Sequence, residues 1–384
     1  MVEVLVAGAG PAGAVTALCL ARAGVRVLLV DRSQFPRDKL CGDTLNPGAM
    51  AVLRTLGLAG PVESAGVPLD GMTVTGPHGV CVEATYAAGQ RGYAISRRDL
   101  DIRLVEAAAA AGAQVELGAR VCAPLVEEDA AVPRVRGVEL AARGRRLRLP
   151  ATVTVGADGR RSTLAFALGL ARHPARPRRW AVGAYVEGLA GMRPRGEMHI
   201  RPGHYLGLSP LPGGITNVCL VTADRARLAD PSGALDDVLR RDPQLRDRAT
   251  AVRRISPVTA LGPLAVDVSG TGLPGLVLAG DAAGFVDPMT GDGLRLALHG
   301  AWLAAGAVLA ELETPGVEAW RRLAAARRQA FARKLRVNRL LRGMVARPTV
   351  VRVGAIGVRL VPGVLRRVVG FAGDEAFARR WSTS

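Results

Sequence analysis

The glycine-rich turn near the start of this chain constrains its fold more than any other feature. Residues 2–7 form an apolar run that predicts a buried strand. The chain then turns into a predicted helix, residues 14–22, through Gly8-Ala9-Gly10-Pro11-Ala12-Gly13. Residues 25–30 predict a second, parallel strand that ends at Asp31. A strand, glycine-rich turn, helix, strand and acid in this order predict a βαβ unit that binds an adenine dinucleotide.

Each part of this unit has a separate task toward the dinucleotide. The glycines permit a tight turn, close approach of the backbone to a pyrophosphate, and close packing of helix on strand. The helix offers free N–H groups and a positive dipole end to the phosphates, and Asp31 is placed to accept hydrogen bonds from a ribose hydroxyl. The residues predicted to bind the dinucleotide here are Gly8, Gly10, Pro11, Ala12, Gly13, Asp31 and Arg32.

Length and composition allow two domains and argue against several other classes of protein. At 384 residues the chain is long enough for two hydrophobic cores. Its five cysteines include no Cys-x-x-Cys pair and its five histidines have no partner at ligand spacing, so we expect no disulfide framework and no metal site. The strand predicted at residue 2 leaves no room for a signal peptide, and no uncharged apolar run approaches the roughly 18 residues of a membrane span. These features predict a cytoplasmic protein.

Positive charge is concentrated toward the carboxyl end of the chain. The net charge is +18, and residues 321–384 hold sixteen Arg or Lys against Asp374 and Glu375. Apolar residues separate the arginines, as in Val350-Val351-Arg352-Val353, which predicts an amphipathic surface that contacts an anionic membrane. The alternative is a solvated arginine-rich helix. Nucleic acid is not expected as a partner, because the tail lacks the aromatic pattern of a stacking platform.

The order of the predicted strands indicates how the chain divides into domains. Buried strands at residues 152–155 and 276–279 return to the dinucleotide-binding unit, while residues 180–255 alternate as in an antiparallel sheet. The prediction is an α/β fold with a discontinuous Rossmann-type domain, an inserted antiparallel β-sheet domain for the substrate, and a basic helical C-terminal tail. The expected boundaries are 1–70, 92–168 and 270–312 for the first domain, 71–91 and 169–269 for the second, and 313–384 for the tail.

Two further motifs stand at the ends of the returning strands. The first reads Gly156-Ala157-Asp158-Gly159, and the second begins at Gly280-Asp281 and continues through Pro288. In this order after the glycine-rich turn, they resemble the FAD-binding motifs of the para-hydroxybenzoate hydroxylase fold, and within it the geranylgeranyl reductase-like family. The resemblance implies that Asp158 approaches the dinucleotide and that Asp281 holds the ribityl hydroxyls of FAD.

The start of another predicted helix also matches this family. Ser96 is placed to cap a helix that begins at Arg97 and ends at Gly112. The resemblance implies that Arg97 contacts the cofactor; a solvated arginine is the alternative, and Arg98 is an adjacent rival. The sequence contains no second glycine-rich strand–turn–helix unit for a nicotinamide cofactor. By resemblance to the hydroxylases, NAD(P)H would bind transiently at the flavin as electron donor.

The continuation of the third motif separates two branches of this fold. Aromatic hydroxylases usually continue with His, paired prolines and Gly-Gln-Gly, whereas this chain reads Pro288-Met289-Thr290-Gly291-Asp292-Gly293, which resembles the geranylgeranyl reductases. Pro288, Gly291 and Gly293 are therefore predicted at the cofactor. The N–H groups that open the following helix would stabilise the anionic reduced flavin. A plain turn before a helix is the alternative.

A second family marker is the segment Lys39-Leu40-Cys41-Gly42-Asp43. It resembles the Lys-x-Cys-Gly segment of reductases that act on prenyl chains, which passes near the flavin and the substrate, so Lys39, Cys41 and Gly42 are predicted at the cofactor. Lys39 is one of only two lysines in the chain, which favours a specific need for a compact ammonium group. Cys41 is the candidate catalytic residue: it would tune the flavin, donate a proton, or only pack.

A third marker departs from the family. Prenyl reductases carry Tyr-x-Trp-x-Phe-Pro before an Asn-Val-Gly stretch; here Tyr205, Pro210 and Asn217 fit, but Gly207 replaces the Trp and Ser209 the Phe. Loss of two aromatic walls widens the predicted substrate pocket. A wider pocket favours a bulky ring system, such as a quinone or aromatic polyketide, over a slim alkenyl chain.

The resemblance implies an FAD-dependent oxidoreductase with a lipophilic substrate. The first hypothesis is reduction of a C=C bond in an isoprenoid- or quinone-like molecule, with water or Cys41 as the proton source, because no His or carboxylate in the sequence stands out as that acid. One alternative is a monooxygenase that hydroxylates an aromatic polyketide or quinone, which needs little beyond a dry pocket. The other is a non-catalytic FAD- or lipid-binding escort. Halogenation is not expected, because the sequence has no Trp-x-Trp-x-Ile segment.

Overall fold

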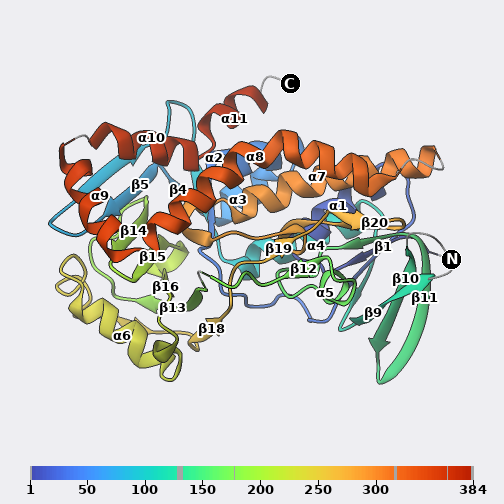
Figure 1. The fold of residues 1–384 in the computed structure, drawn as a ribbon, viewed down its shortest axis with the longest axis horizontal. Coiled ribbons are helices and arrows are strands. Elements are labelled where there is room, and N and C mark those ends of the chain that lie inside the picture. Colours follow the sequence, from blue (N-terminus) through green and yellow to red (C-terminus); the bar gives the residue numbers. More distant parts are fainter. Residues whose placement is uncertain (1, 128–132, 177, 315–317, 361, 382–384) are drawn as a thin grey trace.

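Two large β-sheets with long helices across one side form the framework of the molecule (Figure 1). The structure is a computed structural model that describes residues 2–127, 133–176, 178–314, 318–360 and 362–381. Its fold is α/β, as predicted.

The first sheet contains the glycine-rich turn. Its main strand order is β20–β21–β11–β1–β2–β8, and neighbours in it are parallel except for β20 and β21. Because β1 lies between β2 and β11, the turn that follows β1 stands near the middle of the sheet. The strands are β1 (Val2–Ala7), β2 (Val27–Asp31), β8 (Gln114–Leu117), β11 (Arg145–Gly156), β20 (Gly272–Leu273) and β21 (Leu276–Leu278).

Different elements cover the two faces of this sheet. On one face, α1 (Pro11–Arg22), α4 (Arg97–Ala110) and α7 (Gly293–Glu313) share one apolar core with alternate residues of β1. On the other face lie α5 (Thr163–Ala167) and the antiparallel ribbon that β9 (Arg120–Glu127) and β10 (Arg134–Ala142) form with β11. The predicted cap of α4 is confirmed, since Ser96 Oγ accepts a hydrogen bond from the Asp99 N–H at 3.0 Å.

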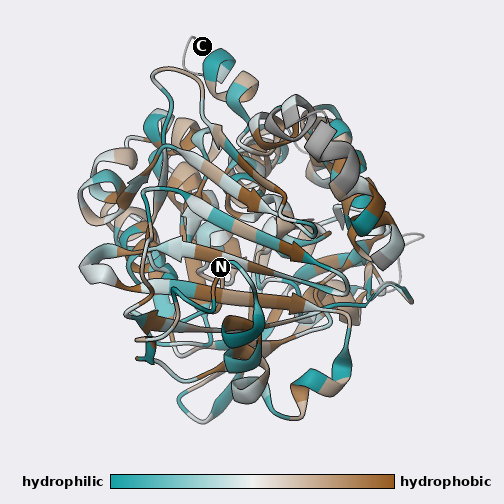
Figure 2. Cartoon of the chain, turned by 90° about the vertical axis from the view of Figure 1, so that its left-hand side faces the viewer, coloured by the Kyte–Doolittle hydropathy of each residue, from teal (hydrophilic) through white to brown (hydrophobic). Residues whose placement is uncertain are grey.

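The second sheet follows the order β17–β13–β16–β15–β14–β5–β6, with β18 also beside β13. Hydrophilic and hydrophobic residues alternate along its strands, which face the viewer in Figure 2. All its neighbours are antiparallel except β14 and β5. The strands are β5 (Gly71–Thr75), β6 (Cys81–Thr85), β13 (Trp180–Glu187), β14 (Gly196–Arg201), β15 (His204–Pro210), β16 (Thr216–Thr222), β17 (Arg253–Arg254) and β18 (Thr259–Leu261).

The prediction of continuous strand structure over residues 180–255 is wrong at α6 (Pro231–Arg241). Asp230 caps this helix by accepting a hydrogen bond from the Gly233 N–H at 2.9 Å. Leu235, Val238 and Leu239 then share one face and pack against the second sheet. Their spacing of three and four residues is the helical period, which the apparent alternation obscured.

Short elements connect the two sheets. A three-stranded sheet contains β3 (Thr44–Leu45), β7 (Gly92–Ala94) and β4 (Val67–Leu69), and the helices α2 (Pro47–Thr55) and α3 (Ala59–Ala65) follow β3 in the chain. A further pair joins β12 (Ala171–Arg172) to β19 (Asp267–Val268).

The C-terminal tail is helical, as predicted, but it packs closely on the rest of the protein. α8 (Ala319–Val345) runs along α7, α9 (Pro348–Leu360) and α10 (Pro362–Ala372) pass over strands of the second sheet, and α11 (Glu375–Trp381) returns to α2 (Figure 1). Lys334 and Arg342 are buried, so the alternative prediction of a solvated arginine-rich helix is wrong for α8. In the described residues α7 is the one helix long and apolar enough to span a membrane, and most of that span is buried inside the protein.

Candidate FAD site

Three motifs distant in sequence meet at one edge of the first sheet. β1 and β21 flank β11, and their carboxyl ends lie level, with Ala7 opposite Gly156 and Gly156 opposite Leu278. A Cβ atom placed on Gly8 would lie 2.5 Å from the Ala157 carbonyl oxygen. The glycine-rich turn, the 156–159 motif and the motif that begins at Gly280 therefore converge where open α/β sheets bind ligands.

The glycine-rich turn has one glycine with no space for a side chain, Gly13, and one with open space beside it, Gly10. A Cβ on Gly13 would lie 1.7 Å from the Gly8 carbonyl oxygen, so this glycine is required by packing alone. A Cβ on Gly10 would meet only the guanidinium ends of Arg37 at 3.6 Å and Arg97 at 3.9 Å. The space beside Gly10, at the amino end of α1, is thus bordered by free N–H groups and two cations, which suits a diphosphate.

A buried carboxylate orients these two cations. Arg97 donates from Nε and Nη2 to the two oxygens of Asp101, each at 2.7 Å, and Arg37 Nη2 lies 3.1 Å from Asp101 Oδ2. Burial lowers the pKa of Arg37, and Asp101 opposes that shift. The rival Arg98 is exposed and faces Asp38 at 3.6 Å, so Arg97 is the arginine directed to the site. Arg37 was not predicted from the sequence, because no motif marks it.

Asp31 lies at the end of β2, as its predicted role requires. Its Oδ2 accepts a hydrogen bond from the Ala9 N–H and its Oδ1 from the Ser33 N–H, both at 2.8 Å. These bonds fix the carboxylate beside the glycine-rich turn and leave further lone pairs for a ribose. The neighbouring Arg32 is exposed.

Lys39 lies close to the second motif. A Cβ on Gly159 would lie 3.9 Å from Lys39 Nζ. Lys39 is exposed as a residue, but desolvation of its ammonium, with repulsion by Arg97 and Arg37, lowers the pKa of Lys39 to about 8. Gly42 follows in the same segment, where a Cβ would meet only Thr44 Oγ1, at 3.9 Å.

The third motif, residues 280–293, forms two short 3₁₀ turns before α7 begins at Gly293. Gly291 ends the second turn with φ of +65°, a conformation that favours glycine. Two residues of the second sheet region hold Asp287. It accepts a hydrogen bond from Arg179, just before β13, at 2.9 Å and one from Tyr205, on β15, at 2.6 Å. Pro288 directly follows this anchored residue.

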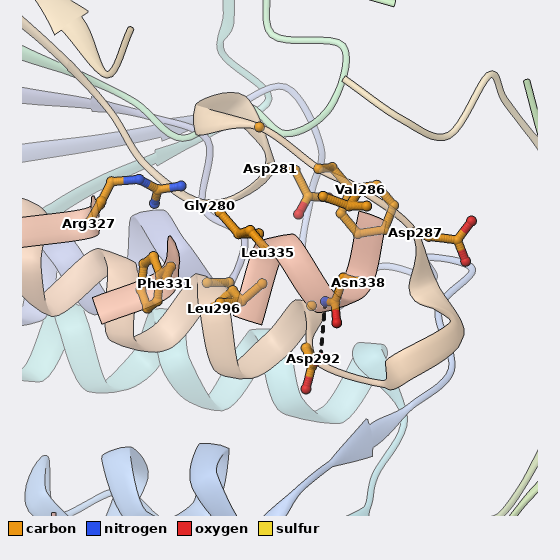
Figure 3. A pocket seen from close by; sticks show the side chains of 14 residues that line it. Gly280, Asp281, Val286, Asp287, Asp292, Leu296, Arg327, Phe331, Leu335 and Asn338 are labelled. Carbon is orange, nitrogen blue, oxygen red and sulfur yellow. Dashed lines mark hydrogen bonds between the residues drawn. The ribbon is translucent and has the colours of Figure 1, made fainter. Parts of the chain in front are cut away.

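A pocket lies between the third motif and the helices α7 and α8 (Figure 3). Asp281 and Val286 border it from the motif, Leu296 from α7 and Phe331 from α8. Asn338 of α8 donates a hydrogen bond of 3.1 Å to Asp292 at its edge. The C-terminal tail therefore forms one wall of this pocket. The sequence analysis did not predict that contribution.

A carboxyl group that the sequence analysis passed over lies next to Cys41. Asp43 is fully buried, and its Oδ2 accepts hydrogen bonds from Tyr185 Oη at 2.8 Å and from Asn217 Nδ2. Asn217 Nδ2 also donates to the Cys41 carbonyl oxygen at 2.8 Å. Burial raises the pKa of Asp43 to about 7, against the opposing effect of these hydrogen bonds and of Arg97.

The residues predicted to line the substrate pocket occupy β15 and β16. Asn217 reaches the Cys41 segment, whereas Tyr205 is buried against Asp287 of the third motif. Ser209 is buried, and its hydroxyl has no hydrogen-bond partner among the described residues. Gly207 and Pro210 are partly exposed, and a Cβ on Gly207 would meet only the Cys219 carbonyl oxygen, at 3.9 Å.

Comparison with known proteins assigns the family. Residues 1–228 match the FAD binding domain family. The chain is 31% identical to a menaquinone reductase of Mycolicibacterium smegmatis, across 100% of this chain and 95% of that protein. It is 29% identical to a digeranylgeranylglycerophospholipid reductase of Methanosarcina mazei, across 79% of this chain and 74% of that protein. The chain belongs to the geranylgeranyl reductase-like family of FAD-dependent oxidoreductases.

Solved structures agree with this family at the level of the fold. A geranylgeranyl bacteriochlorophyll reductase-like protein from Thermoplasma acidophilum superposes with a TM-score of 0.78 at 22% identity, over 91% of this chain and 89% of that one. The flavin-dependent brominase Bmp2 superposes with a TM-score of 0.83 at 19% identity, over 99% and 97%. Reductases and halogenases thus share the architecture, so the fold alone does not select the reaction.

The site of this family member fits FAD on its own geometry. The open space at Gly10 accommodates a diphosphate beside Arg37, Arg97 and the amino end of α1. Asp158 Oδ1, at the second motif, is buried and has no hydrogen-bond partner among the described residues, as expected of a group that a polar ligand would contact. Burial also raises the pKa of Asp158, as expected for a carboxyl left without full solvation.

Proposed function

We propose that the protein uses reduced FAD, supplied with electrons by NAD(P)H, to reduce a C=C bond in a lipophilic isoprenoid- or quinone-like molecule. The similarity to a menaquinone reductase along the whole chain carries this proposal. Bound FAD would supply a two-electron reduction at the cleft. The N–H groups of α1 with Arg37 and Arg97 would hold its diphosphate, Asp31 a ribose, and Asp281 the ribityl chain.

We expect the remaining predicted contacts to surround the reacting ring. Lys39, Cys41 and Gly42 come from one side of the cleft, and Gly291 and Gly293 come from the start of α7. The positive end of the α7 dipole would stabilise negative charge on the reduced ring. Tyr205 would act indirectly, by holding Asp287 and so the turn that contains Pro288.

A monooxygenase acting on an aromatic polyketide or quinone is the second candidate. The open space at Gly207 favours a substrate with a broad ring over a slim chain. Such a reaction would use the same FAD site and would consume molecular oxygen.

Anaerobic turnover tests the proposed reduction. The FAD-loaded protein is mixed with menaquinone and either NADH or NADPH without oxygen, and the product is analysed by mass spectrometry. A gain of two hydrogen atoms on the isoprenoid chain supports the proposal. Activity that requires oxygen, with labelled oxygen in the product, would replace it by the monooxygenase, and a flavin that never turns over would favour the escort.

We also propose that the tail contacts the surface of an anionic membrane from the cytoplasm. Leu340, Met344 and Val353 are exposed hydrophobic residues on α8 and α9, and the exposed arginines Arg339 and Arg352 lie beside them in the sequence. Apolar side chains among cations suit an interface with anionic lipid. Flotation with vesicles of phosphatidylglycerol, but not of phosphatidylcholine, is expected, and L340E with M344E should abolish it. Equal flotation of the double variant would contradict this contact.

A further inference from the structure

The position of Asp43 gives its two carboxyl oxygens different surroundings. Oδ2 accepts hydrogen bonds from two donors of the second sheet, Tyr185 on β13 and Asn217 on β16. Oδ1 is buried with no side-chain donor among the described residues, and the backbone N–H of Arg97 is a further donor that lowers the pKa of this carboxyl. A proton held by this carboxyl therefore belongs on Oδ1, because Oδ2 already faces two hydrogen-bond donors.

The backbone fixes Asp43 in this orientation. Its φ is +53°, an uncommon value for a residue other than glycine, and its carbonyl oxygen accepts a hydrogen bond from the Ile95 N–H at 2.9 Å. Asn217 holds both the Cys41 carbonyl and the Asp43 carboxyl, so the segment with the family motif is attached directly to the second sheet. A strained residue that its surroundings over-determine is typical of a functional position.

The groups around Asp43 allow it to hold a proton near neutral pH. Burial raises its pKa to about 7, while Asn217, Tyr185 and Arg97 of α4 pull in the opposite direction. The nearest thiols are Cys41 in its own segment and Cys219 on β16. Burial raises the pKa of Cys219 to about 12, which makes that thiol a weak acid.

We propose that Asp43 is the acid that delivers a proton to the substrate C=C bond, an inference that rests on the reduction proposed above. One carbon forms a C–H bond with the proton from Asp43 Oδ1 as the π bond breaks. The other carbon would take up a hydride, with its two electrons, that bound reduced FAD would supply on being oxidised. The carboxylate left at Asp43 regains a proton from solvent, and Tyr185 and Asn217 act as positioning residues.

The substitution D43N tests this role because the amide keeps the size of the side chain but cannot donate the proton as an acid does. With menaquinone as probe, we expect kcat to fall about 10²- to 10⁴-fold. The protein should still bind FAD, and dithionite should still reduce it. The matched control is D38N, the same change at an exposed position in the preceding loop, for which we expect unchanged turnover.

Two readouts separate proton donation from a structural role. In the FAD-loaded protein without substrate, infrared titration should show a carboxylic acid C=O band that disappears around pH 7 and is absent in D43N. The variant Y185F removes a donor that lowers the pKa of Asp43, so the alkaline limb of the pH–kcat profile should move to higher pH. A merely structural role would leave that limb in place.

Three outcomes would overturn the inference. The first is normal reduction by the wild type with unchanged turnover in D43N, which removes this role and leaves the proposed function intact. The second is a wild-type protein whose infrared spectrum lacks the titrating band at neutral pH. The third is oxygen insertion by the wild type, which removes the proposed function and this step together.

Discussion

The only two lysines of this chain occupy opposite kinds of site. Lys39 lies near Gly159 of the second motif, is exposed, and takes part in no carboxylate salt bridge among those found in the described residues. Lys334 is buried between Asp292 at 2.9 Å and Asp374 at 3.1 Å, and it also donates to the Phe371 and Ala372 carbonyl oxygens. The first ammonium is left for a ligand, whereas the second is fully used by the protein.

The surroundings of the two lysines differ in the space that they leave. Near Lys39 the glycine-rich turn leaves open space, and polar atoms such as Asp158 Oδ1 have no partner among the described residues. Around Lys334, Asn46 also donates to the Ala372 carbonyl oxygen, at 2.9 Å, so α2, α7, α8 and α10 meet at one point. Asn338 Oδ1 and Arg295 Nη1 in this second region also lack a hydrogen-bond partner within the described part of the chain, so the contrast lies in the ammonium groups themselves, one open and one fully hydrogen-bonded.

Loss of the buried lysine should have the largest effect. In K334M, Asp292 and Asp374 lose their shared cation, and we expect the free energy of unfolding to fall by about 3–5 kcal/mol. Urea denaturation of the FAD-free protein measures this change. The control R333M removes an exposed cation one residue earlier and should change stability little. A small effect of K334M would remove the contrast between the two lysines.

The open glycine should matter for the cofactor and not for folding. G10A adds a methyl group beside Arg37 and Arg97 with no clash, so we expect normal stability but at least ~100-fold weaker FAD binding, about 2.7 kcal/mol. Flavin fluorescence titration and urea denaturation measure the two quantities. G60A, in a surface helix where a Cβ meets nothing within 4 Å, is the matched control. Wild-type FAD affinity in G10A would show that the diphosphate lies elsewhere.

The joint between helices should be sensitive to acid through His299. Burial lowers the pKa of His299 to about 3, and its ring packs at 4.8–5.2 Å from Trp381, Phe377 and Phe331. Between pH 6.5 and 3 the unfolded chain binds a proton that the folded chain does not, so stability falls as pH falls. H299F should remove this dependence and gain about 2 kcal/mol at pH 5 relative to the wild type.

Thermal or urea unfolding at pH 5 and pH 8 tests this, since at pH 8 the histidine is neutral in both states and no such gain is expected. A gain of the same size at both pH values would assign it to packing.

Substitution of the exposed Lys39 should have the smallest effect, and it should change FAD binding without changing stability. We expect K39M to weaken FAD binding about tenfold, ~1.4 kcal/mol, at low salt, with no loss of stability. Because the pKa of Lys39 is about 8, wild-type affinity should decline as pH rises through 8, and the variant should lose that decline. Isothermal titration from pH 7 to 9 measures both. A stability loss like that of K334M would mean that Lys39 is structural.

Local patterns predicted the α/β class, the strands that precede each motif, and the cap of α4 because each depends on neighbouring residues. The roles of Asp43 and Lys334 could not be predicted, because they depend on residues far away in the sequence. The donors to Asp43 lie 142 and 174 residues away along the chain, and the carbonyls that hold Lys334 belong to α10. Burial of a charged group is a property of distant segments, so a sequence pattern at the residue itself does not reveal it.

Lys334 anchors Asp292 and is itself held by the carbonyl groups of Phe371 and Ala372 in α10, which has a consequence for biogenesis. A ribosome finishes all three FAD motifs well before it produces α10. Until α10 emerges and docks, Lys334 lacks the two carbonyl groups that hold it beside Asp292, in the loop before α7. We therefore expect cofactor loading to be a late event that follows synthesis of the tail. A transcript broken shortly after α7 would yield a polypeptide that carries every recognisable flavin motif and yet stays colourless.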